Sequence, residues 1–198
     1  SVTAAGHGII IGTNLNDASN VSWRPDTTTF NGAATLLPDS IQSVTHFVGS
    51  ITLAKALKIK GAAFVESSAI FKPSGFPLTV TGAFSVTGNG RLQMINAADS
   101  VDVGGLFSAT SGTSSSGDLT QGVLFLRGGF AQGNSSLSFA PSGSHRVRFG
   151  GGTAQGITFA DPTTSGFNLV EFADAAGVTA ASDFTAASTA TVVSGTVT

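Results

Sequence analysis

The sequence predicts an all-β fold: a single-stranded parallel β-helix, or β-solenoid, of about 23 residues per coil. Two observations predict this fold, a repeat of fixed length and an alternation of apolar and polar residues before each repeated position. Four glycines recur at one constant interval, at Gly82, Gly105, Gly128 and Gly151. A constant period of roughly 20–50 residues is typical of proteins that stack one structural unit on the next.

The residues around these glycines predict which side chains face the interior. One inward ladder comprises Leu78, Val101, Leu124 and Val147, and a second comprises Val80, Val103, Leu126 and Phe149. An aromatic stack is expected from Phe84, Phe107 and Phe130. Equivalent side chains of parallel strands lie above one another at a spacing of about 4.8 Å. The recurring glycine allows either a bend with positive φ or a close approach of two backbones.

Taken from the N-terminus, residues 1–43 are the least regular part of the chain, and we expect them to form a cap. A bare terminal coil would expose backbone and apolar interior, so some covering segment is physically needed. From residue 44 the alternation is clear, and residues 44–198 are assigned to the solenoid. The interval from Gly61 to Gly82 is slightly shorter than the period, so this coil is shorter than those that follow.

A second strand is expected in most coils, followed by a turn. These strands are Ile70–Phe71, Leu92–Met94, Leu137–Phe139 and Ile157–Phe159. The coil that contains Gly105 and Phe107 has instead a serine-rich stretch, Ser111–Gly117, which predicts a surface loop. A shift by one period carries Val147 and Phe149 onto Val170 and Phe172, and a second shift carries them onto Val193 and Gly195.

An antiparallel β-sandwich or jelly roll is the competing fold. Short strands separated by turns at intervals of about 8–12 residues also describe that class. A sandwich gives no reason, however, for three successive equal intervals with matched glycine and phenylalanine. The solenoid is therefore favoured.

Composition restricts the class of protein. The chain has 198 residues, of which 10% are charged, and a net charge of −2. This balance favours neither nucleic acid nor an anionic membrane as a partner. There are no cysteines, which excludes disulfides and thiolate metal sites. The sequence contains no run of about 18 apolar residues, so no transmembrane segment is predicted. Low charge with abundant Ser, Thr and Gly favours a secreted or cell-surface protein over a cytosolic enzyme.

Four segments combine glycine and phenylalanine, and a fifth combines a short apolar run with turn residues: Leu78–Phe84, Leu126–Gln132, Ser138–His145 and Gln155–Pro162, with Leu92–Asp99 as the fifth. They resemble repeats of large secreted bacterial surface proteins of the adhesin-like parallel β-helix type. The resemblance covers residues 44–198 and is specific for the kind of repeat. It implies a right-handed β-helix outside the cell, and it supplies no catalytic residues.

In one outward-facing column, the side chains are expected to differ in charge and polarity from one coil to the next. It contains Thr79, Asp102, Phe125, Arg148 and Glu171, so that Arg148 and Glu171 become neighbours of opposite charge. An outward phenylalanine is covered by a loop or marks a contact surface. His145 with Arg146 and Arg148 forms a basic cluster, for which a solvated corner is the leading interpretation and binding of a sulfate, a uronate or a carboxylate of a neighbouring chain is the alternative. The predicted contact surface is Phe125, Arg127, His145, Arg146 and Arg148.

No catalytic, cofactor or metal residues are predicted. The histidines His7, His46 and His145 lie far apart, whereas a metal site needs converging ligands. Asp99 and Asp102 are close in sequence, but Asp99 is expected in a turn, and as a pair the two are expected to be solubilising.

We therefore expect a non-enzymatic extracellular structural or adhesive β-solenoid, which serves as a rigid scaffold or as a subunit of a filament, surface layer or larger complex. Its expected partners are other protein subunits, further coils of a longer chain, or surface glycans, with no cofactor. The alternative is a carbohydrate-binding or polysaccharide-cleaving β-helix that uses the surface around Asp102, Arg127 and Arg148.

Overall fold

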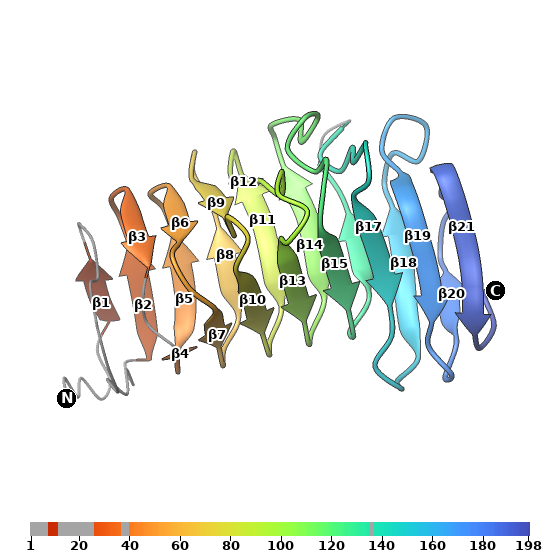
Figure 1. Cartoon of the computed structure of the whole chain (residues 1–198), viewed down its shortest axis with the longest axis horizontal. Coiled ribbons are helices and arrows are strands. Elements are labelled where there is room, and N and C mark those ends of the chain that lie inside the picture. Colours follow the sequence, from red (N-terminus) through yellow and green to blue (C-terminus); the bar gives the residue numbers. More distant parts are fainter. Residues whose placement is uncertain (1–7, 12–25, 37–39, 135–136) are drawn as a thin grey trace.

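Parallel strands stack into three sheets in a computed structural model that describes residues 8–11, 26–36, 40–134 and 137–198. Figure 1 shows the strands as successive layers along the long axis of the molecule, from β1 to β21. Every strand pair within these residues runs parallel, with equivalent residues in register over most of the length. The described chain is therefore a parallel β-solenoid, as the sequence predicts.

The largest sheet has nine strands. In spatial order these are β1 (Gly8–Ile11), β2 (Thr27–Phe30), β5 (Val44–Phe47), β8 (Ala63–Val65), β11 (Phe84–Gly88), β14 (Phe107–Ser111), β16 (Phe130–Gln132), β18 (Gln155–Phe159) and β20 (Val178–Ala180). Buried and partly exposed residues alternate along most of them, which is the pattern of a sheet with one face on the core.

The second sheet has eight strands. These are β4 (Ser40–Ile41), β7 (Leu57–Ile59), β10 (Pro77–Val80), β13 (Ser100–Val103), β15 (Val123–Leu126), β17 (Arg146–Phe149), β19 (Phe167–Ala173) and β21 (Ala186–Ser194). The inward ladders predicted from the sequence are confirmed here, because Leu78, Val101 and Leu124 pair in register. The ladder continues through Val147 to Val170.

The third sheet has four strands, β3 (Ala34–Leu36), β6 (Ile51–Leu53), β9 (Ile70–Lys72) and β12 (Arg91–Leu92). It ends at β12, and from β14 onward loops connect the two larger sheets in its place. In Figure 1 the loops that follow β14 and β18 project along one edge of the stack. Coils with three strands thus give way to coils with two strands and a longer connection.

Stacked coils begin before residue 44. Strands β2, β3 and β4 pair in parallel with β5, β6 and β7, so these three strands supply all three sides of a coil. Residues 1–7, 12–25 and 37–39 of the expected cap lie outside the described residues. His7 is among them.

Phenylalanines form a continuous aromatic spine through the interior. Its members are Phe30, Phe47, Phe71, Phe84, Phe107, Phe130, Phe167 and Phe184, and the ring centroids of successive members are 4.9 to 6.3 Å apart. The predicted stack of Phe84, Phe107 and Phe130 is confirmed as its centre. Separations in this range are those at which aromatic pairs attract one another beyond their burial.

Glycine is required at the recurring corner by close approach, not by positive φ. A Cβ on Gly82, Gly105 or Gly128 would lie 2.4 to 2.8 Å from backbone atoms of the coil before it. Gly151 differs, since its φ is +140° and its nearest neighbour is the side chain of Arg127. The glycine stack thus runs from Gly61 to Gly128 and stops there.

Three expectations for the later coils are wrong. Leu137–Phe139 is a turn rather than a strand, with Leu137 at a φ of 64°. Ile157 lies in the nine-stranded sheet and pairs with Phe130, because an insertion makes this interval longer than the period. At the last coil Val170 pairs with Ala190 rather than Val193, and Phe172 pairs with Val192 rather than Gly195.

Candidate functional site

The outer face of the eight-stranded sheet carries the column predicted from the sequence. Thr79, Asp102, Phe125, Arg148 and Glu171 pair one above the next on β10, β13, β15, β17 and β19. Strand alternation places them outside because the residues on either side of each, such as Leu124 and Leu126 around Phe125, are buried. This surface is the candidate functional site.

Asp102 and Arg127 form a two-point ion pair at one end of the site. Arg127 Nε donates to Asp102 Oδ1 at 2.8 Å and Nη2 donates to Oδ2 at 2.9 Å. These hydrogen bonds raise the pKa of the Arg127 guanidinium. Parallel donation from a guanidinium to a carboxylate is the most specific geometry that such a pair adopts.

Phe125 lies between two guanidinium groups. The Cζ atoms of Arg127 and Arg148 are 4.4 and 5.7 Å from its ring centroid. Distances below about 6 Å give favourable cation–π attraction. The half-buried ring is therefore partly covered by charged side chains, and it also lies against Gly150, where an added Cβ would be 3.1 Å from Phe125 Cζ.

Glu171 faces two arginines at the other end of the site. Its carboxylate lies 3.2 Å from Arg148 Nε and 3.7 Å from Arg146 Nη1. The vertical pair of Arg148 and Glu171 is thus as expected. One carboxylate faces two cations here, and about half of the Arg146 side chain, 51%, is exposed.

His145 does not belong to this surface. The expected solvated corner is wrong, since His145 is completely buried between two exposed neighbours. Its Nδ1 lies 2.8 Å from the carbonyl oxygen of Gln121, and its Nε2 has no hydrogen-bond partner. Desolvation by burial lowers the pKa of this imidazole to about 4. The predicted cluster is therefore split, with only Arg146 and Arg148 outside.

Asp99 is also an internal residue, so the expectation that it is solubilising is wrong. It is 2% exposed, and its carboxylate accepts hydrogen bonds from the backbone N–H groups of Gly75 at 2.6 Å and Asn96 at 2.9 Å. A buried carboxylate is tolerated when such donors replace water. Asp99 joins the turns of two successive coils and is unavailable to the surface around Asp102.

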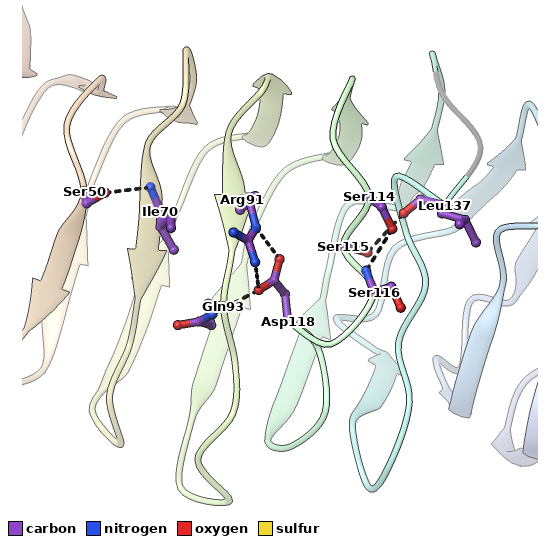
Figure 2. Close-up of polar contacts among 9 residues, drawn as sticks. All are labelled: Ser50, Ile70, Arg91, Gln93, Ser114, Ser115, Ser116, Asp118 and Leu137. Carbon is purple, nitrogen blue, oxygen red and sulfur yellow. Dashed lines mark hydrogen bonds and ion pairs between the residues drawn. The ribbon is translucent and has the colours of Figure 1, made fainter.

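A second polar cluster, not predicted from the sequence, lies where the four-stranded sheet ends. Figure 2 shows Arg91 and Gln93 turned toward Asp118. The Asp118 carboxylate, 1% exposed, accepts from Arg91 Nε at 2.6 Å and Nη2 at 2.5 Å, and from Gln93 Nε2 at 3.0 Å. The hydrogen bonds raise the pKa of Arg91.

The Asp118 cluster has a structural explanation. It attaches the loop after β14 to β12, where no further strand extends the four-stranded sheet. The same loop is held by the N–H of Ser115, which donates to the Leu137 carbonyl at 2.9 Å. The Ser115 hydroxyl lies 3.4 Å from the same carbonyl (Figure 2). The stretch expected as a surface loop is a loop after its first residue, but Ser111 itself ends β14, and Ser111 and Ser115 are buried.

His46 forms a further contact on the outer face of the nine-stranded sheet. Its Nδ1 is 2.9 Å from Glu66 Oε1, and its ring stacks on Phe64 at 4.8 Å between centroids. Phe64 faces outward because Ala63 takes the inward position opposite Phe84. The offset of Phe64 by one residue from the aromatic pattern is the sequence signal for this arrangement.

The described part of the chain contains no cluster of three His, Cys, Asp or Glu residues that could hold a metal ion. In the same residues there is no helix of the length and hydropathy that a membrane span requires. No protein-family model matches the chain, and neither curated proteins nor solved structures give a significant match. The class of protein defined by the fold is the parallel β-solenoid.

Proposed function

We propose that this β-solenoid is a non-enzymatic structural or adhesive protein that works outside the cell, as a rigid scaffold or as a subunit of a filament, surface layer or larger complex. The observation that carries the proposal is the aromatic spine, which links the coils from Phe30 to Phe184 without a gap. A core of this kind specifies a stiff body whose sides are free for contacts.

The use of polar groups supports the same function. The buried carboxylates of Asp99, Asp118 and Asp174 each hold a turn or loop to a neighbouring segment. A catalytic carboxylate needs access to a substrate and a pKa suited to proton transfer. These three are instead committed to structural hydrogen bonds. Low charge and the resemblance to secreted repeats support a place outside the cell.

Polysaccharide cleavage is the less favoured function. It would require Asp102 to act as an acid or base beside Arg127 and Arg148. Asp102, however, is held by two hydrogen bonds from Arg127, which occupy both oxygens of its carboxylate. The glycan-binding part of this alternative is compatible with an adhesive role.

Cleavage and location can be tested separately. Purified chain incubated with polygalacturonate and other acidic polysaccharides should release no new reducing ends above a heat-denatured control. Cleavage that disappears in the Asp102→Ala variant would contradict a non-enzymatic role.

Protease treatment of intact source cells should remove the protein if it is displayed outside, and its survival until the cells are lysed would contradict that location.

A further inference from the structure

Charge is distributed unevenly over the molecule. Five of its nine Lys and Arg residues lie on the outer face of the eight-stranded sheet or directly after its strands: Lys58, Lys60, Arg127, Arg146 and Arg148. Among the described residues, the same positions carry three carboxylates: Asp102 and Glu171 on the face, and Asp174, which is buried directly after β19. These positions therefore have a net charge of +2, from five cations and three anions, on a chain whose net charge is −2.

The internal ion pairs leave an excess of positive charge at one place. Arg127 is matched by Asp102, whereas Glu171 is shared between Arg146 and Arg148. At 3.7 Å the Arg146 contact is longer than a good charged hydrogen bond, which is typically about 2.7–2.9 Å. The Arg146 guanidinium thus keeps donors available to a further anion.

A shallow groove lies beside this guanidinium. It has a volume of about 290 Å³ and crosses β17, β19 and β21, with Arg146 and Glu171 in its lining. Leu169 and Val193 give it apolar surface, and Thr189 and Thr191 give it hydroxyl groups. The groove forms because the small side chains of β21 follow the larger ones of β17 and β19 on the same face.

This combination fits a carboxylated sugar. A sugar ring has apolar C–H faces and several hydroxyls, which match Leu169 and the threonines, while Glu171 can accept from a hydroxyl. A carboxylate on the ring matches the Arg146 guanidinium in charge and in planar geometry. The volume is at the lower end for small-ligand sites and suits about one or two sugar units.

We propose that the outer face of the eight-stranded sheet binds an acidic polysaccharide, with one uronate unit in the groove and its carboxylate on Arg146. The remaining cations, spaced along strands about 4.8 Å apart, attract the rest of the polymer along the rod. This inference deepens the adhesive part of the proposed function and rests on it.

The test measures binding of polygalacturonate to the full chain by calorimetry at low and physiological salt. Dextran, dextran sulfate and single-stranded DNA are the comparison polymers. Polygalacturonate should bind, dextran should not, and dextran sulfate and DNA should bind at least tenfold more weakly. If dextran sulfate binds more tightly than polygalacturonate, the assignment of a carboxylate as the ligand group is wrong. If DNA binds as tightly as polygalacturonate, general charge attraction explains the binding and the specific site in the groove is wrong.

Two variants locate the site and a third serves as their control. Arg146→Gln should weaken polygalacturonate binding about tenfold, the effect of losing one charged hydrogen bond. Thr191→Phe fills the groove without changing the charge and should also weaken binding. Lys72→Gln removes the same charge from β9 in the four-stranded sheet and should leave binding within about twofold of the wild type. Equal affinities for the wild type and all three variants would overturn the site.

The result separates this inference from the proposed scaffold role. Circular dichroism and thermal melting of each variant establish that the fold is retained. A folded wild type that fails to bind polygalacturonate overturns the glycan site and leaves the scaffold proposal intact. Cleavage of the polymer would instead contradict the non-enzymatic role.

Discussion

His145 shows how burial changes the meaning of a single residue. Its neighbours Arg146 and Arg148 are exposed, yet the alternation of the strand places its own ring in the interior against Phe139. The neutral imidazole can donate from Nδ1 to the Gln121 carbonyl, which leaves the unprotonated Nε2 in an apolar environment. Protonation of this nitrogen would place a charge in the interior, where the cost of desolvation exceeds the attraction of the Gln121 carbonyl and the Asp99 carboxylate, and this lowers the pKa.

Acid should therefore destabilise the protein through His145. The pKa of the folded imidazole, about 4, is below the ordinary value of 6.5, so the unfolded chain binds the proton first as the pH falls. The contribution of His145 to the free energy of unfolding is present in full above about pH 6.5. It is lost between about pH 6.5 and 4, by about 3 kcal/mol in total. Chemical unfolding at pH 7 and pH 4 measures this loss.

His145→Asn supplies the control for this pH dependence. The asparagine amide can still donate toward the Gln121 carbonyl but does not titrate in this range. The loss of stability between pH 7 and 4 should be smaller in the variant by about 3 kcal/mol. If wild type and variant lose the same amount, other groups cause the acid sensitivity.

The glycine corner acts at the scale of the element. At Gly105 the backbone of one coil contacts Gly82 and Ala83 of the coil before it, so the repeat depends on the absence of a side chain. Close packing of this kind cannot relax by rotating a side chain, because the neighbouring atoms are backbone.

Gly105→Ala should destabilise the protein by about 1–3 kcal/mol, the usual cost of overpacking. Its added Cβ would lie 2.7 Å from Ala83 N. Gly156→Ala is the matched control, because a Cβ there meets no atom within 4 Å and the φ is not in the left-handed region. Urea unfolding of both variants should separate them. Similar midpoints would show that the corner tolerates a methyl group.

Where successive coils have the same number of residues, the register of their strands could be predicted from the sequence. Where the number changes, it could not. The ladders through Leu78 and Phe84 follow from the period because equal coil lengths keep equal positions in register. After Phe130 an insertion breaks the period, and alternation alone does not say which sheet the next strand joins. The pattern around Ile157 therefore predicts a strand correctly but assigns it to the wrong side of the coil.

The surface site was predictable in part for the same reason. The outward column of Asp102, Phe125, Arg148 and Glu171 depends only on register. The position of Arg146 beside a groove depends on the small residues of β21, whose interval is shorter than the period. The contact between Arg91 and Asp118 joins distant positions of the chain without any local pattern.

For the whole molecule, β21 is the most exposed part of the sheet structure. It is a nine-residue strand of which eight residues are exposed, including Val192 at 56% and Val193 at 60%. Within the described residues, it is one of the two edge strands of the eight-stranded sheet, with β4 at the other edge. A long apolar edge is a template for pairing with another strand.

We expect purified protein to associate as its concentration rises, through this edge. Val192→Lys should reduce the association, since a lysine at an edge opposes strand pairing while its stem still covers the interior. Thr158→Lys adds the same charge to β18, away from an edge, and should leave association unchanged. Light scattering across a concentration series compares them. Equal association in both variants would exclude β21 as the contact.

The parallel direction of every described strand pair also gives the rod two unlike ends. A two-fold axis relates identical surfaces, so it cannot join the front of one stack to the back of another. Copies that continue each other's sheets head to tail, with all strands still parallel, must instead repeat a translation along the rod with some rotation about it. Such a contact does not close on itself, and each added copy presents the same free edge as the one before. Growth by this route is directional, like that of a polymer with distinct ends.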